Sequence, residues 1–109
     1  MNASKTNIQF HYLYRDAGNY KNFGSIIFSN PEFISIETLK EQIRSVLIDG
    51  EFINHKKAGI PALFFPKKNS DDHSWHEFEN IEETDEAPTD VRTINEFLTS
   101  LRFQNVPAV

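Results

Sequence analysis

Residues 8–15 alternate between two kinds of side chain at every step. Because successive side chains of a strand point to opposite faces, this period of two predicts a strand. One of its faces is apolar and carries Ile8, Phe10, Tyr12 and Tyr14. The other face carries Gln9, His11, Leu13 and Arg15. The alternation therefore predicts a strand with one face against a core.

A turn and a returning strand follow this segment. Residues 15–24 are rich in Gly, Asn and Asp, which accept positive φ angles and form local side-chain caps. We expect a turn or a long hairpin loop there, and a second strand at residues 25–29. Pro31 ends that strand because proline has no backbone N–H for the ladder.

Two segments are typical of amphipathic helices. After Ser35, the apolar side chains recur on a 3.6-residue period, at Ile36, Leu39, Ile43, Val46 and Leu47. Ser35 is a suitable N-cap and Gly50 can close the far end. The second helix begins at Thr93, which forms a capping-box pattern with Glu96. Its apolar face consists of Ile94, Phe97, Leu98 and Leu101.

The middle of the chain is less regular. Residues 52–53 suit a short extended piece, and residues 54–59 suit a turn or one helical turn. Residues 60–65 form an apolar run beside Pro61 and Pro66, which predicts an edge strand. Residues 75–81 have apolar side chains spaced by three, a helical hint, but their length and flanking loops favour a strand. Residues 82–90 are acidic and contain Pro88, so we expect a loop.

These elements predict an α+β fold in the order strand, strand, helix, strand, strand, helix. The simplest architecture is a four-stranded, mostly antiparallel sheet packed under two helices. The length of 109 residues suits a single domain, residues 1–109, with the ends 1–6 and 104–109 frayed. The first residues contain no apolar segment of a secretory signal, and no apolar run could span a bilayer. We therefore expect a cytoplasmic protein with no membrane partner.

The acidic C-terminal part is the strongest compositional signal. The formal charge is −5 overall, but residues 1–68 carry +3 and residues 69–109 carry −8. Such a stretch repels nucleic acid and attracts basic surfaces of other proteins. We hypothesise a small protein-interaction module, in its sharpest form an inhibitor or regulator that presents a nucleic-acid-mimicking surface to a nucleic-acid-processing protein. The competing interpretation is a solvated loop that only keeps the protein soluble.

Catalytic chemistry finds little support in the sequence. There is no cysteine, which excludes a thiol nucleophile, a disulfide framework and a cysteine-zinc site. The nucleophile-elbow, phosphate-loop and dinucleotide motifs are absent. His73 and His76 could bind a metal on a helix, but on a strand they point to opposite faces. We predict no catalytic residue, metal or cofactor, and consider an enzyme the less favoured option.

A cluster of aromatic and charged residues follows the first strand. Tyrosine and arginine are enriched at protein contacts, so a recognition loop is one interpretation, and a core tyrosine beside a local turn is the other. The predicted partner-binding residues are Tyr14, Arg15, Asp16, Tyr20, Lys21, Trp75, Glu77, Glu79, Glu82, Glu83, Asp85 and Glu86. The alternative function is a small-molecule-binding or catalytic domain with a site around Tyr14, Arg15, Trp75 and His76.

Three segments of the chain resemble a family of small bacterial proteins of unassigned function. They are residues 14–21 (YRDAGNYK), residues 75–78 (WHEF) and residues 88–97 (PTDVRTINEF). The resemblance covers most of the chain after residue 7 and implies a bacterial or phage origin. It implies no activity, cofactor or catalytic residue.

Overall fold

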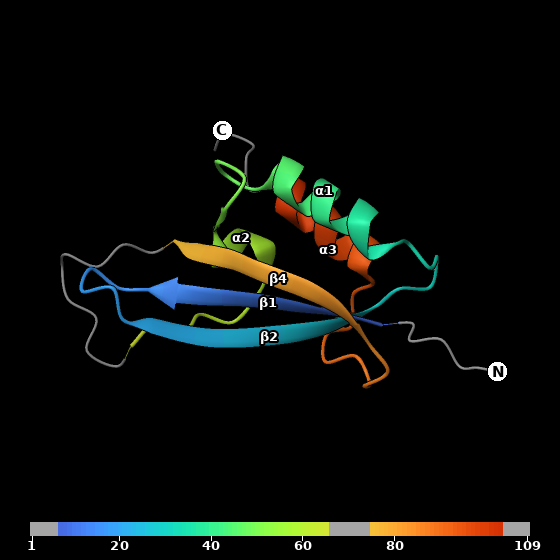
Figure 1. The fold of residues 1–109 in the computed structure, drawn as a ribbon, viewed down its shortest axis with the longest axis horizontal. Helices are drawn as coiled ribbons and strands as arrows, with labels where there is room; N and C mark the ends of the chain where they lie inside the picture. The colour runs from blue at the N-terminus through green and yellow to red at the C-terminus, as the bar shows by residue number, and fades with distance from the viewer. Residues whose placement is uncertain (1–6, 66–74, 104–109) are drawn as a thin grey trace.

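The computed structural model describes residues 7–65 and 75–103. The elements follow one another as β1 (Asn7–Arg15), β2 (Lys21–Ser29), α1 (Ile36–Val46), β3 (Phe52–Ile53), α2 (His55–Ala58), β4 (His76–Thr84) and α3 (Ile94–Phe103). The strands form one antiparallel sheet in the order β2-β1-β4-β3. The prediction of an α+β fold with a four-stranded antiparallel sheet is confirmed. Figure 1 shows α1 and α3 together along one side of this sheet.

Strand β1 lies in the middle and pairs along nearly its whole length with β2 on one side and β4 on the other. Its predicted apolar face is the buried one: Ile8, Phe10, Tyr12 and Tyr14 are at most 1% exposed. We call this the inner face of the sheet, and the opposite side the outer face. Residues directly opposite each other in a ladder share a face, so the register of β1 assigns faces to both neighbouring strands.

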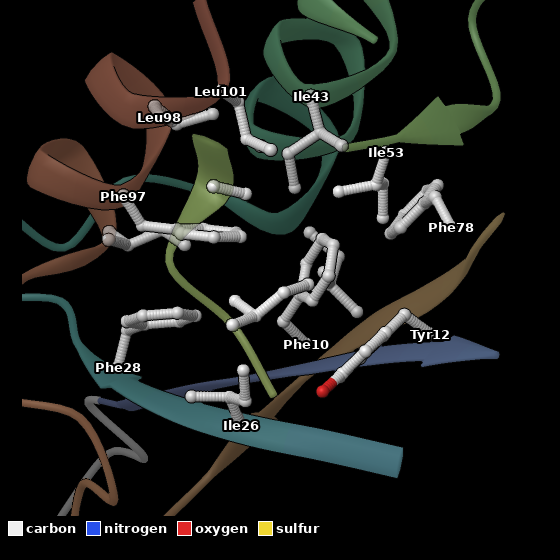
Figure 2. Close-up of a cluster of buried hydrophobic side chains, with 14 of the residues drawn as sticks. Phe10, Tyr12, Ile26, Phe28, Ile43, Ile53, Phe78, Phe97, Leu98 and Leu101 are labelled. Carbon is white, nitrogen blue, oxygen red and sulfur yellow. The ribbon is translucent and has the colours of Figure 1, made fainter. Parts of the chain in front are cut away.

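Aromatic rings from separate elements meet over the inner face. Phe97 of α3 stacks on Phe28 of β2, with ring centroids 4.3 Å apart, and meets Phe10 of β1 edge-on at 4.9 Å. Phe10 also stacks on Phe78 of β4 at 5.3 Å. Figure 2 shows these side chains beneath the aliphatic side chains of the helices, among them Ile43 and the leucines of α3. Burial of such rings is the main favourable contribution to a core of this kind.

Both predicted helices form, and their N-terminal caps are those expected, whereas the prediction that Gly50 closes the first helix is wrong because α1 ends at Val46 with Leu47 as its C-cap. The Ser35 hydroxyl accepts a hydrogen bond from the Thr38 N–H at the start of α1. At the start of α3, the Thr93 N–H donates to the Glu96 carboxylate at 2.8 Å. The Glu96 N–H donates back to the Thr93 hydroxyl at 3.2 Å. This reciprocal pair is a complete capping box.

The prediction of a strand at residues 60–65 is wrong. This segment has no strand partner and crosses the inner face near the hairpin end of β1 and β2. The Tyr12 hydroxyl and the Asn22 amide donate to the carbonyls of Pro61 and Leu63, at 2.7 and 3.1 Å. Side chains thus satisfy backbone groups that a ladder would otherwise satisfy. Leu63 packs so closely on Gly24 that a Cβ there would lie 2.9 Å from it.

The fourth strand and the helix count also differ from the prediction. The short pair β3, Phe52–Ile53, takes the place expected for residues 60–65, and it pairs with Glu77 and His76. Residues 55–58 form a helix, α2, so residues 7–65 and 75–103 contain three helices, in the order strand, strand, helix, strand, helix, strand, helix. Asn54 caps α2 by accepting from the Lys57 N–H. Strand β4 extends to Thr84, so residues 82–84 are not in a loop.

A bulge in β4 explains the spacing that resembled a helix. Tyr12 lies opposite Phe78, whereas its neighbour His11 lies opposite Asn80, so Glu79 has no partner in β1. The extra residue shifts the alternation by one. As a result Phe78 and Ile81, three residues apart, both lie on the inner face, where both are buried.

A tight turn connects β2 to α1 and contains an unusual backbone conformation. The Asn30 side chain is buried, donates to the Ile34 carbonyl at 3.0 Å and accepts from the Ile34 N–H at 3.1 Å. Within this loop Phe33 has a φ of 53° and is 66% exposed. A left-handed conformation costs a residue with a side chain about 1–2 kcal/mol relative to its ordinary range. Phe33 therefore occupies a strained and exposed position.

Replacement of phenylalanine by glycine should affect the free energy of unfolding differently at positions 33 and 23, because only Phe33 has a left-handed backbone conformation. We expect Phe33→Gly to leave the free energy of unfolding unchanged or raise it by up to about 1 kcal/mol, since glycine relieves the strain. Phe23→Gly in β2, where the phenyl ring is 56% exposed, should lower it by about 1 kcal/mol, since glycine weakens a strand. Urea unfolding of both variants measures this. A loss of stability in Phe33→Gly as large as in Phe23→Gly would contradict it.

Candidate functional site

The outer face near the hairpin carries an internally paired charge cluster. Arg15 donates to both carboxylate oxygens of Glu77, from Nε at 2.9 Å and from Nη2 at 3.2 Å. Arg15 Nη1 also donates to the Asn19 side chain at 2.6 Å. Glu77 is 8% exposed, and a carboxylate with so little water needs such a partner. Glu77, predicted as a contact residue, thus neutralises and orients Arg15.

The hairpin turn presents aromatic side chains to solvent. The Asp16 carboxylate accepts from the Tyr20 N–H at 2.9 Å, and Asn19 adopts a φ of 68°, so these residues form the turn itself. Tyr20 and Lys21 are exposed, as is Trp75 immediately before β4. We call Arg15, Asp16, Tyr20, Lys21 and Trp75 the hairpin surface. The interpretation of a core tyrosine beside a local turn agrees with this geometry, and the recognition loop stays a prediction.

Tyr14 and His76 lie in the core. They are opposite each other in the β1–β4 ladder on the inner face, and both are fully buried. Arg15 and Glu77, the next residues along the two strands, point to the outer face. The structure thus brings Tyr14 and His76 together, but on the side of the sheet away from Arg15. The four residues of the alternative small-molecule site do not face one shared space.

His55 of α2 packs against His76 on the inner face of the sheet. The rings of His55 and His76 lie 4.8 Å apart, and the edge of Phe64 meets His55 at 5.3 Å. The Leu63 N–H donates to His76 Nε2 at 3.0 Å, which requires this nitrogen to be unprotonated. Burial lowers the pKa of His55, and the positive charge of Lys56 lowers it further. The surroundings of both rings therefore favour the neutral form of the imidazole.

Stability should consequently depend on pH through His55. Since its pKa is lower in the folded state than the ordinary 6.5, the unfolded chain binds protons more readily. Stability is then fully present above about pH 6.5 and falls as the pH drops below it. Urea unfolding between pH 7.5 and 5 measures the decrease, which we expect to be smaller in His55→Gln. The variant His11→Gln, on the outer face, is the control. An unchanged pH profile in His55→Gln would contradict the assignment.

The acidic residues fall into two groups. Asp90 is paired: Arg92 donates to it from Nη2 at 2.9 Å, and these hydrogen bonds lower the pKa of Asp90. By contrast, the carboxylates of Glu79, Glu83, Asp85 and Glu86 are exposed and form no ion pair with any residue in 7–65 or 75–103. Glu82 is exposed as well, and its carboxylate lies 2.6 Å from His11 Nε2.

The end of β4 and the following turn hold four of these exposed carboxylates. We call Glu82, Glu83, Asp85 and Glu86 the acidic end. The turn is fixed by hydrogen bonds: the Asn7 side chain donates to the Glu86 carbonyl at 2.7 Å, and the Glu86 N–H donates to the Thr84 hydroxyl at 3.2 Å. Figure 1 shows this turn at the opposite end of the sheet from the β1–β2 hairpin. The acidic end is therefore an ordered surface, separate from the hairpin surface.

A cleft adjoins the acidic end. It is shallow and open to solvent, has a volume of about 360 Å³, and is lined by Asn7, Ser29, Asn30, Pro31 and Phe33. Asn7 links the two features, because it lines the cleft while its side chain holds the Glu86 carbonyl. The sequence did not reveal Phe33 or the cleft. Asn30 and Pro31 predict only the end of a strand, and nothing in the sequence gives the φ angle of Phe33.

Among the described residues, no group of three or more His, Asp or Glu side chains is arranged to hold a metal ion. Asp71, Asp72 and His73, which the sequence placed beside His76, lie outside the described residues. Within residues 7–65 and 75–103, no helix has the length and apolar character needed to cross a bilayer.

Comparison with known proteins assigns no family. No family model matches the chain, and neither the curated proteins nor the solved structures yield a significant match.

Proposed function

We propose that the chain is a non-enzymatic protein-interaction module that binds a basic surface of a partner protein through the acidic end. The observation that carries the proposal is the fixed turn with exposed carboxylates that have no cation among the described residues. A turn whose backbone is already hydrogen-bonded loses less freedom on binding than a loose loop, which must first be ordered. Complementary charge also accelerates association and selects the partner.

The hairpin surface is the proposed second contact. Tyr20 and Trp75 supply exposed aromatic side chains of the kind enriched at protein interfaces, and Lys21 adds an exposed cation. Glu77 supports it by holding the guanidinium of Arg15 in place. Tyr14 is fully buried on the inner face of the sheet, so it is not part of the proposed contact surface.

The sharpest form of the proposal is regulation or inhibition of a nucleic-acid-processing protein. The groove of such a protein is lined with Lys and Arg that neutralise phosphates. Exposed carboxylates would occupy that groove in place of the phosphates. The alternative, a small-molecule or catalytic site around Tyr14, Arg15, Trp75 and His76, has less support because these side chains lie on both faces of the sheet.

The test uses two variants with equal charge. One replaces the acidic end: Glu82→Gln, Glu83→Gln, Asp85→Asn and Glu86→Gln. The control neutralises four other exposed acids: Glu37→Gln, Glu41→Gln, Asp49→Asn and Glu51→Gln. The partner is captured from the source organism with the tagged full chain, and its affinity is then measured by calorimetry.

We expect the acidic-end variant to bind the partner at least about tenfold more weakly, and the control to keep wild-type affinity within about threefold. Wild-type binding should weaken steeply between 0.05 and about 0.2 M salt because the contact is electrostatic. Equal affinities for the wild type and the acidic-end variant would overturn the proposal. An equal loss in both variants would overturn it too, because net charge rather than this surface would be responsible.

A further inference from the structure

Phe33 is an exposed aromatic side chain in a backbone conformation that phenylalanine disfavours. The paired hydrogen bonds between the Asn30 amide and Ile34, together with the bond from the Phe33 N–H to the Asn30 carbonyl, hold the turn closed. On either side of it the chain returns to the core, since Asn30 is buried and Ile34 packs against the core cluster. Pro31, Glu32 and Phe33 are exposed between these two residues. Phe33 is the aromatic member of this exposed segment and is 66% exposed, so packing of the core does not explain an aromatic residue there.

The cleft beside Phe33 has a size suited to a side chain. Its volume of about 360 Å³ lies near the lower limit of ligand pockets, about 300–1,000 Å³. Pro31 and Phe33 give it apolar surface, while Asn7, Ser29 and Asn30 give it a polar wall. Aromatic side chains that line such a concave site are typical anchors of protein contacts.

The charges around the cleft restrict its occupant. The turn with Asp85 and Glu86 adjoins it through Asn7, and Glu32 is exposed beside Pro31. Nucleic acid and anionic lipid would be repelled there. A second copy docked through the same end would place like charges opposite one another. A segment rich in Lys and Arg is the occupant that these charges favour.

We propose that the cleft binds one apolar side chain of a basic partner segment, with the ring of Phe33 packed against it and the acidic end paired with the flanking Lys or Arg. This inference rests on the proposed function and adds to it the anchor and the sequence character of the partner segment.

Two synthetic lysine-rich peptides, which represent the proposed basic partner segment, test this inference. Both have three lysines on each side of a Gly-X-Gly centre, with X as Leu in one and Ser in the other. Each is titrated into the ¹⁵N-labelled full chain in 50 mM salt, and affinities are taken from amide chemical shifts. The variants are Phe33→Gly and, as a control at another exposed phenylalanine, Phe103→Ser.

We expect the wild type and Phe103→Ser to bind the Leu peptide about tenfold more tightly than the Ser peptide, since burial of one leucine provides about that much. The Leu peptide alone should shift the backbone amide signals of Asn30, Glu32, Phe33 and Ile34. Phe33→Gly should bind both peptides with the affinity that the wild type has for the Ser peptide. Equal affinities in the wild type, or a Leu preference that survives in Phe33→Gly, would overturn the inference.

The same titration separates this inference from the proposed function. The acidic-end variant should lose affinity for both peptides. If it binds the Ser peptide as the wild type does, or if the wild type binds neither peptide, the proposed function fails and the inference fails with it. If only the Leu preference is missing, the inference fails and the electrostatic contact stands.

Discussion

The double pairing of β1 is the constraint on which the rest of the structure depends. This strand makes antiparallel ladders with β2 and β4, so its alternation decides which side chains of three strands face the helices. A shift of one residue in either ladder would exchange the inner and outer faces of the shifted strand. With four large side chains of β1 fully buried, such a shift would expose an entire apolar set, and the register is correspondingly well determined.

The same register sorts the acidic residues into those that stabilise the fold and those left for solvent. Glu77 lies on the outer face beside Arg15 and is neutralised there, and Asp90 is neutralised by Arg92. Arg92 in turn donates to the carbonyls of Ala58 and Gly59, so that pair joins α2 to the start of α3. The carboxylates of Glu79, Glu83, Asp85 and Glu86 have no ion-pair partner among the described residues, and Glu82 is exposed beside His11. The acidic stretch of the sequence therefore contains two groups of carboxylates in the fold, one ion-paired with arginine and one exposed to solvent.

Much of the fold could be predicted from local chemistry. The alternation of β1, the stripe of α1 and the capping box of α3 depend on residues close in sequence, and each was predicted from them. The failures have long-range causes. Residues 60–65 have a strand-like composition, but their carbonyls are taken by Tyr12 and Asn22, some 40 to 50 residues away. The burial of Glu77 depends on Arg15, and the bulge that places Phe78 and Ile81 on one face depends on the ladder with β1.

The central claim is that the acidic end, with the Phe33 cleft, is the surface that a partner covers. Hydrogen–deuterium exchange of the full chain, alone and bound to its captured partner, measures this directly, because binding slows exchange where it excludes water or stabilises the backbone. The account predicts slowed exchange in residues 30–34 and 83–90, with a smaller effect at residues 15–21. Slowed exchange confined to residues 55–65, with residues 30–34 and 83–90 unchanged, would contradict it.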